Sequence, residues 1–128
     1  MEQGYLMDTN TAIDYLACLL PDNAVKLIDN ITAEISVITR IELLAWPDAT
    51  SDDTTLLNNF ISDCVVWNLS EDIILKTIEV RKKYNLKIGD AIIAATTLVN
   101  REGYFLLSRN LSDFNKVPGL TVINPHTL

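Results

Sequence analysis

Apolar stretches with strand-like and helix-like spacing alternate along this chain, and this alternation constrains its fold more than any other feature. Strands are predicted at residues 5–7, 33–38, 65–67, 104–107 and 120–123. Helices are predicted at residues 10–20, 22–31, 39–46, 54–64, 70–84 and from 89 to 99 or 101. Strands that are separated by helices pair into a parallel sheet covered on both faces. We therefore expect an α/β fold.

The size and composition of the chain fit one packed domain over residues 1–128. The 128 residues are 48% hydrophobic and 21% charged, which excludes intrinsic disorder as the main description. No apolar run reaches the ~18 residues of a membrane-spanning helix, and the N-terminus lacks the positive region of a signal peptide. We expect a cytoplasmic protein in which Cys18 and Cys64, isolated in sequence, are reduced, core-filling residues and not zinc ligands.

The acidic charge balance narrows the ways in which this chain could act on nucleic acid. Its formal net charge is −7 and its isoelectric point is about 4.5. Such values argue against a simple basic nucleic-acid-binding domain. Acidic residues gathered around a metal ion would produce the same balance, so a nuclease is not excluded. The positions of the carboxylates along the chain are therefore informative.

Four carboxylates lie close to predicted strand ends or helix starts. Asp8 follows the first strand, and Asp113 lies in the segment after the strand at residues 104–107. In parallel sheets, ligands bind beyond the carboxyl ends of the strands. Glu42 and Asp90 lie in the first turns of two predicted helices. The helix after Asp90 is rich in alanine, which predicts close packing and a central position.

Each carboxylate also has an explanation that involves no ligand. Asp8 is a good helix N-cap, and Thr39 and Glu42 have the spacing of a capping box. The helix dipole would favour Asp90 by ~0.3–1 kcal/mol, and Asp113 is an ordinary loop residue. Several carboxylates at one sheet edge, however, repel each other unless a cation neutralises them. Oxygen ligands suit Mg²⁺ or Mn²⁺, so together the four favour a metal site.

In order and spacing, the motifs around these carboxylates resemble those of the PIN domain family, in particular its VapC-type toxin ribonucleases. The matching segments are residues 6–10 (LMDTN), 36–44 (SVITRIELL), 89–95 (GDAIIAA), 107–110 (LSRN), 113–114 (DF), 117–120 (VPGL) and 123–125 (INP). The resemblance covers essentially the whole chain. It implies a three-layer α/β/α sandwich with a central parallel sheet of about five strands, and a divalent-metal-dependent endoribonuclease.

The resemblance also carries roles over to particular residues. The catalytic and metal-binding acids would be Asp8, Glu42, Asp90 and Asp113, with Mg²⁺ or Mn²⁺ as the cofactor. Asp113 would bind the ion or orient it through water. The supporting polar residues would be Thr9, Asn10, Ser108 and Asn110. Ser108 replaces the usual threonine and keeps its hydroxyl group, whereas Gly89 replaces a proline that is common in relatives.

The implied reaction is attack of a metal-activated water on an RNA phosphodiester bond. The leaving oxygen would take its proton from water, because the single histidine, His126, is remote from the motifs and is expected to be a solvated tail residue. Cations near the motifs are candidate RNA phosphate contacts, although cations at a helix end are favourable in any case. They are Arg40, Arg81, Lys82, Lys83, Lys87 and Arg109.

The resemblance further implies a small antitoxin partner, an RNA substrate and a homodimer, with no membrane association. Residues 46–53 and the two N-terminal helices are candidate partner surfaces. Trp46 and Trp67 are expected in the core and not as platforms for RNA bases.

Two other functions remain open. A phosphatase of the haloacid dehalogenase type is disfavoured, because it would have a second aspartate where Asn10 stands. A non-catalytic PIN-like module that binds RNA or protein is the main alternative. Substitution of Asp8 by asparagine distinguishes such a module from an enzyme, because an enzyme would lose its activity and a binding module would keep its function.

Overall fold

Five parallel strands form one sheet at the centre of the computed structural model, which describes residues 3–100 and 103–128. The strand order is β3-β2-β1-β4-β5. The strands are β1 (Tyr5–Met7), β2 (Glu34–Ser36), β3 (Val65–Trp67), β4 (Phe105–Leu107) and β5 (Thr121–Ile123). The seven α-helices of the described residues are α1 (Thr9–Leu16), α2 (Asp22–Asp29), α3 (Val37–Leu44), α4 (Ser51–Ser62), α5 (Glu71–Tyr84), α6 (Ile88–Asn100) and α7 (Leu111–Phe114). A 3₁₀ turn, η1 (Pro125–Thr127), follows β5.

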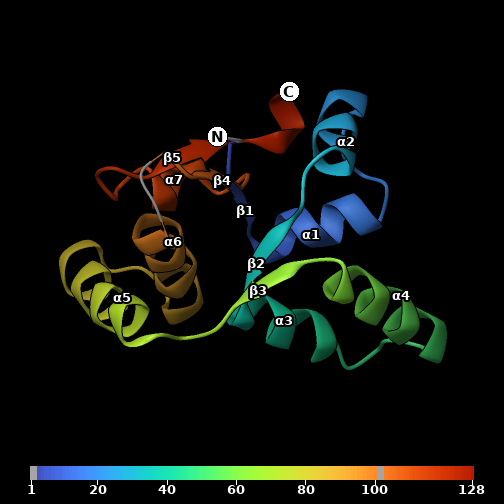
Figure 1. The fold of residues 1–128 in the computed structure, drawn as a ribbon, viewed down its shortest axis with the longest axis horizontal. Helices are drawn as coiled ribbons and strands as arrows, with labels where there is room; N and C mark the ends of the chain where they lie inside the picture. The colour runs from blue at the N-terminus through green and yellow to red at the C-terminus, as the bar shows by residue number, and fades with distance from the viewer. Residues whose placement is uncertain (1–2, 101–102) are drawn as a thin grey trace.

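Two hydrophobic cores lie on opposite faces of this sheet. Successive strand residues point to opposite faces, so Leu6 and Leu106 join one core while Met7 and Leu107 join the other. Residues of α5, α6 and α7 complete the first core, and residues of α1 to α4 complete the second. Figure 1 shows α5 and α6 on one side of the strands and α1, α2 and α4 on the other. This arrangement confirms the predicted three-layer α/β/α sandwich.

The strands are aligned so that their carboxyl ends meet at one edge. Met7 pairs with Ile35 and Leu107, and Leu107 pairs with Ile123. After β1 the chain passes to β2 on one side, whereas β4 lies on the other side of β1. Such a divergence opens a crevice beyond the strand ends, where ligands bind in sheets of this type.

Several element boundaries differ from those predicted. Helix α1 ends at Leu16 and not at residue 20, because Cys18 adopts a left-handed conformation with φ of 59°. Strand β2 ends at Ser36, whose hydroxyl oxygen accepts a hydrogen bond from the Ile38 amide and starts helix α3. The predicted extension of the helix after Asp90 to residue 101 falls outside the described residues.

Two expectations about buried side chains are wrong. Cys18 is exposed, and Trp46 keeps 49% of its surface exposed. Cys64 is half-buried, and this burial raises the pKa of its thiol to about 11. Trp67 does pack against the core, and its indole N–H donates to Glu34 at 2.8 Å. None of the helices in the described ranges has the length and apolar character needed to cross a membrane.

Candidate active site

Asp8 lies directly beyond β1 and is 5% exposed. Its Oδ1 accepts a hydrogen bond from the Thr11 amide at 2.8 Å, so Asp8 does cap helix α1. Its Oδ2 accepts a second bond from the Ser108 hydroxyl at 2.6 Å. Ser108 follows β4 and in turn accepts a bond from the Asn110 amide at 3.0 Å. Helix capping therefore explains only one of the two carboxylate oxygens of Asp8. The second oxygen is held by Ser108 at the crevice between β1 and β4.

Glu42 lies in the second turn of α3, and the predicted capping box with Thr39 is wrong. The N-cap of α3 is Ser36, three residues earlier. Instead, Glu42 Oε1 accepts a hydrogen bond from the Thr9 hydroxyl at 2.6 Å. Thr9 Oγ1 also lies 3.1 Å from the buried Thr39 hydroxyl. Because a hydroxyl carries one proton, Thr9 gives its own to the carboxylate and accepts one from Thr39.

The start of helix α6 lies next to Glu42. A Cβ atom at Gly89 would stand 4.0 Å from Glu42 Oε2, which is ordinary van der Waals contact. Asp90 follows in the first turn of α6 and is half-buried. Helix α6 is buried along most of its length, as its alanine content predicted.

The pKa of Asp90 responds to the charges of the other three acids, which therefore lie within electrostatic reach of it. Burial raises the pKa of Asp90 above its usual range, and the negative charges of Asp113 and Asp8 raise it further. Lys87 lowers that pKa, and Glu42 adds a smaller increase. Asp90 therefore lies among like charges that are only partly compensated, which is typical of a functional site.

Asp113 lies at the exposed side of the same group, in helix α7. Its Oδ2 accepts a hydrogen bond from the Asn110 side chain at 3.1 Å, and its Oδ1 lies 3.3 Å from Lys116 Nζ. These hydrogen bonds, with the charges of Lys116 and Lys87, lower the pKa of Asp113. Asp113 thus remains ionised, while Asp90 takes up a proton more readily.

The donor set of this crevice fits a hard divalent cation. Carboxylate oxygens come from four separate segments, and the raised pKa of Asp90 reports negative charge that a cation would neutralise. Within residues 3–100 and 103–128, no three acidic, histidine or cysteine side chains are already arranged as a metal site.

The predicted cations differ in what they contact. Lys83 pairs with Glu79 at 3.1 Å on the surface of α5, and Arg81 and Lys82 are exposed beside it. Lys87 acts on the charges of Asp90 and Asp113 and so belongs to the carboxylate group. Arg40 is exposed on α3, and Asn10 is exposed on α1.

A buried acid that the sequence patterns did not reveal lies behind Arg109. Asp14 Oδ2 lies 2.8 Å from His126 Nε2 and 3.3 Å from Arg109 NH1. The expectation that His126 is a solvated tail residue is therefore wrong, because the ring is partly buried against helix α1. The sequence carries no clear signal for Asp14, because its neighbours one helical turn earlier, Asn10 and Thr11, are also polar.

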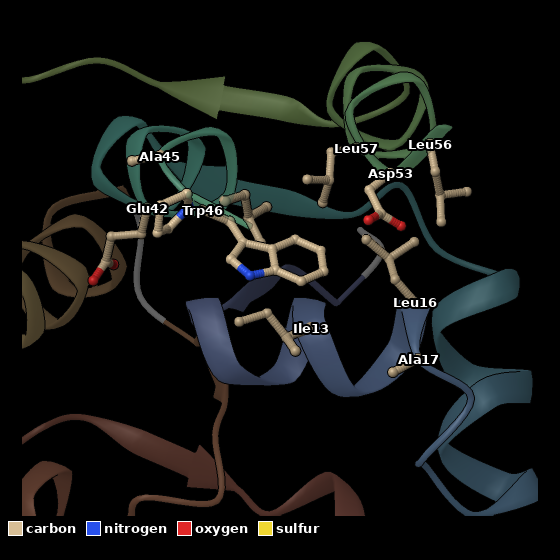
Figure 2. Close-up of a pocket in the computed structure, with 11 residues that line it drawn as sticks. Ile13, Leu16, Ala17, Glu42, Ala45, Trp46, Asp53, Leu56 and Leu57 are labelled. Carbon is tan, nitrogen blue, oxygen red and sulfur yellow. The ribbon is translucent and has the colours of Figure 1, made fainter. Parts of the chain in front are cut away.

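An apolar groove of about 560 Å³ lies between helices α1, α3 and α4. Figure 2 shows the Trp46 indole between Ile13 of α1 and Leu57 of α4, with Leu56 and Leu16 farther along the groove. Glu42 stands at one end with its carboxylate directed away from Trp46 (Figure 2). Glu42 therefore belongs both to the lining of the groove and to the group of four acids.

Comparisons with known proteins show the family to which this chain belongs. The profile of the PIN domain matches residues 5–119, so the chain belongs to the PIN domain family. A toxin–antitoxin complex from Klebsiella pneumoniae contains a similar chain, with 30% identity, a TM-score of 0.76 and coverage of 95% of this chain and 98% of that one. A comparison with curated protein sequences gives no match.

Two further solved structures share the fold at lower identity. DNA-bound VapBC from Salmonella typhimurium is 21% identical, with a TM-score of 0.82 over 95% of this chain and 98% of that one. FitAcB from Neisseria gonorrhoeae is 18% identical, with a TM-score of 0.71 over 97% and 99% of the two chains.

Proposed function

We propose that this protein is a divalent-metal-dependent endoribonuclease and the VapC-type toxin of a toxin–antitoxin pair. The observation that carries the proposal is the group of four acids around Asp90, contributed by α6, α7, α3 and the end of β1. Membership of the PIN domain family and the likeness to a toxin–antitoxin complex of 30% identity support it.

Asp8, Glu42 and Asp90 would hold Mg²⁺ or Mn²⁺, with Asp113 binding or orienting it from the exposed side. When bound, such an ion supplies a nucleophilic hydroxide and stabilises charge on the phosphate. Ser108 orients Asp8, and Thr9 orients Glu42, through hydrogen bonds of 2.6 Å each. The chain thus fixes the direction of two ligands before an ion arrives, which is the usual role of residues behind a metal site.

Asn110 and Lys116 have a different part in this proposal. Both hydrogen-bond to Asp113 and keep its carboxylate ionised, so that it remains an acceptor at the mouth of the crevice. Lys87 partly balances the charges of Asp90 and Asp113. A cation in this position also suits an approaching RNA phosphate.

For the partner, we propose a small antitoxin that places an apolar segment in the groove between α1, α3 and α4. Large apolar side chains are exposed there, including Trp46 and Leu56. Contiguous exposed apolar surface marks sites of protein interaction, and such grooves accept amphipathic helices. We further propose that the protein acts in the cytoplasm as a homodimer.

Cleavage of RNA by purified, partner-free protein tests the enzymatic proposal. Wild-type protein should cut total RNA with Mg²⁺ or Mn²⁺ and stop when a chelator is added. Asp8→Asn should abolish cutting, since asparagine still caps a helix but loses the charge. Asp63→Asn, the same change at an exposed residue of α4's C-cap, is the matched control and should cut normally.

Two results would contradict the enzymatic proposal. One is an absence of cleavage by wild-type protein together with no growth arrest on expression. The other is growth arrest that persists in the Asp8→Asn variant. The second result would favour the non-catalytic binding module.

A further inference from the structure

A second charged cluster lies outside the four acids. Asp14 is on α1, Arg109 follows β4, and His126 lies in η1 after β5. Asp14 Oδ2 is 2.8 Å from His126 Nε2 and 3.3 Å from Arg109 NH1. One buried carboxylate oxygen therefore ties together two segments that leave the sheet at its carboxyl edge.

The two partners of this ion pair differ in their exposure to solvent. The Asp14 side chain is 6% exposed, whereas the Arg109 side chain is 52% exposed. A buried carboxylate requires partners, and Asp14 Oδ2 has two of them, His126 and Arg109. The ion pair uses one nitrogen of the guanidinium group, which carries five N–H donors in all. Arg109 thus presents a half-exposed guanidinium group to solvent, with one nitrogen held by Asp14.

The position of Arg109 places that cation beside the carboxylate crevice. Its neighbour Ser108 donates to Asp8 Oδ2, so the main chain at Arg109 starts at the crevice itself. Asp14 lies six residues after Asp8 on α1, which is ~9 Å along a helix. The guanidinium group is therefore drawn along α1, away from the four acids.

We propose that Arg109 binds a backbone phosphate of the RNA adjacent to the phosphate that is cleaved, and that Asp14 is the positioning residue that holds it there. This inference rests on the proposed ribonuclease function. A molecule with a net charge of −7 needs local cations to bind a polyanion. An arginine that is already held in place loses less conformational freedom on binding than a free one, and its planar fork matches phosphate oxygens.

The test compares Arg109→Gln, Arg109→Lys, Asp14→Asn and the double variant Asp14→Asn/Arg109→Gln with wild type. Cleavage of a single-stranded RNA is measured at several concentrations to separate KM from kcat. Arg109→Gln and Asp14→Asn should each raise KM about fivefold, the size of an exposed charge contact, with kcat within about twofold. The double variant should resemble Arg109→Gln, because Asp14 acts through Arg109. Arg109→Lys should recover part of the loss.

Two further measurements separate positioning from folding and from catalysis. The affinity of Arg109→Gln for Mn²⁺ should match that of wild type, because Arg109 is outside the metal site. Its melting temperature should fall only slightly, because His126 still pairs with the buried Asp14. The binding of a fluorescent single-stranded RNA, followed by anisotropy against salt, should lose about 0.7 from its logarithmic slope when one phosphate contact is removed. Asp63→Asn controls for the change in net charge of Asp14→Asn, and Lys26→Gln, at an exposed residue of α2, controls for the opposite change in Arg109→Gln.

Other results would overturn the inference. If Arg109→Gln leaves KM and the salt dependence unchanged, Arg109 does not bind phosphate. If Asp14→Asn lowers kcat and stability without raising KM, Asp14 only supports the fold. If wild-type protein binds RNA but does not cleave it, the ribonuclease proposal fails, while the salt dependence of Arg109→Gln still decides this inference.

Discussion

The carboxylate crevice and the apolar groove lie side by side and share Glu42, yet they are built in opposite ways. Residues at strand ends and helix starts form the crevice, and hydrogen bonds fix their directions. Helices α1, α3 and α4 form the groove, which is lined by exposed apolar side chains such as Trp46 and Leu56 above core residues such as Leu57. Sheet topology therefore positions the four acids, whereas helix surface forms the groove that we propose binds a partner.

The crevice and the groove also differ in how far their side chains are buried. Asp8 is 5% exposed and bonded through both oxygens, whereas Trp46 is 49% exposed. Substitutions in the crevice should therefore change activity, and substitutions in the groove should change association with little effect on folding. The predictions below test this division, beginning with the largest expected effect.

Substitution of Glu42, which the crevice and the groove share, tests whether this residue is needed for cleavage. Glu42→Gln keeps an oxygen that can accept from Thr9 but loses its charge. Cleavage should fall by about 100-fold or more, because even the outer partners of metal ligands are worth about 10–100-fold. Asp52→Asn, an exposed acid of α4, is the control and should leave the rate unchanged. A comparable loss in both variants would mean that general charge, and not the site, controls the rate.

The free energy of unfolding should respond differently to substitutions in the core and in the groove. Leu106→Ala removes a fully buried side chain from β4 and should lower the free energy of unfolding by about 3 kcal/mol. Trp46→Ala should lower it by less than about 1 kcal/mol, since exposed positions contribute little. Urea denaturation measures both. If Trp46→Ala is as destabilising as Leu106→Ala, the groove is part of the core and not a binding surface.

The hydroxyl of Thr9 tests the orientation of Glu42. Thr9→Val removes the hydrogen bond to Glu42 at similar volume, and Thr9→Ser keeps it. Cleavage should fall about tenfold in Thr9→Val and stay near wild type in Thr9→Ser. Equal rates for the two variants would show that the orientation of Glu42 does not limit activity.

Removal of the Asp90 charge should stabilise the metal-free protein. Burial and the neighbouring Asp113 and Asp8 raise the pKa of Asp90 in the folded state, so its ionised form is disfavoured by folding. The resulting cost to the free energy of unfolding is absent below the pKa of Asp90 in the unfolded chain, near 4. It grows as the pH rises through the higher pKa of Asp90 in the folded state. Asp90→Asn should thus melt at a higher temperature than wild type at neutral pH, and this gain should vanish near pH 4. A lower melting temperature at neutral pH would contradict this interpretation.

Much of the fold and the approach of the four acids could be predicted from the order of elements. Strands β1 and β4 are short and apolar, so their ends are visible in the sequence as the first polar residues, Asp8 and Ser108. The carboxyl ends of parallel strands meet at one edge whatever the details of the helices. The proximity of these positions is therefore a consequence of topology.

Other features depend on pairings or exposure that local patterns do not contain. Ser36 is the N-cap of α3 because β2 ends there. In the sequence, the strand-like run continues through residue 38, so Thr39 is the better candidate for the start of the helix. Asp14 meets His126 across 112 residues of sequence, which no local pattern predicts. Trp46 is apolar like a core residue, and only the final packing of α1, α3 and α4 leaves it exposed.

Binding of Mn²⁺ to the metal-free protein, measured by titration calorimetry, tests most directly whether the crevice is a metal site. Wild-type protein should bind Mn²⁺, and Asp90→Asn should bind it at least about tenfold more weakly, while Trp46→Ala in the neighbouring groove should bind it as wild type does. Equal Mn²⁺ affinity in wild type and Asp90→Asn would contradict the assignment of the four carboxylates to a metal.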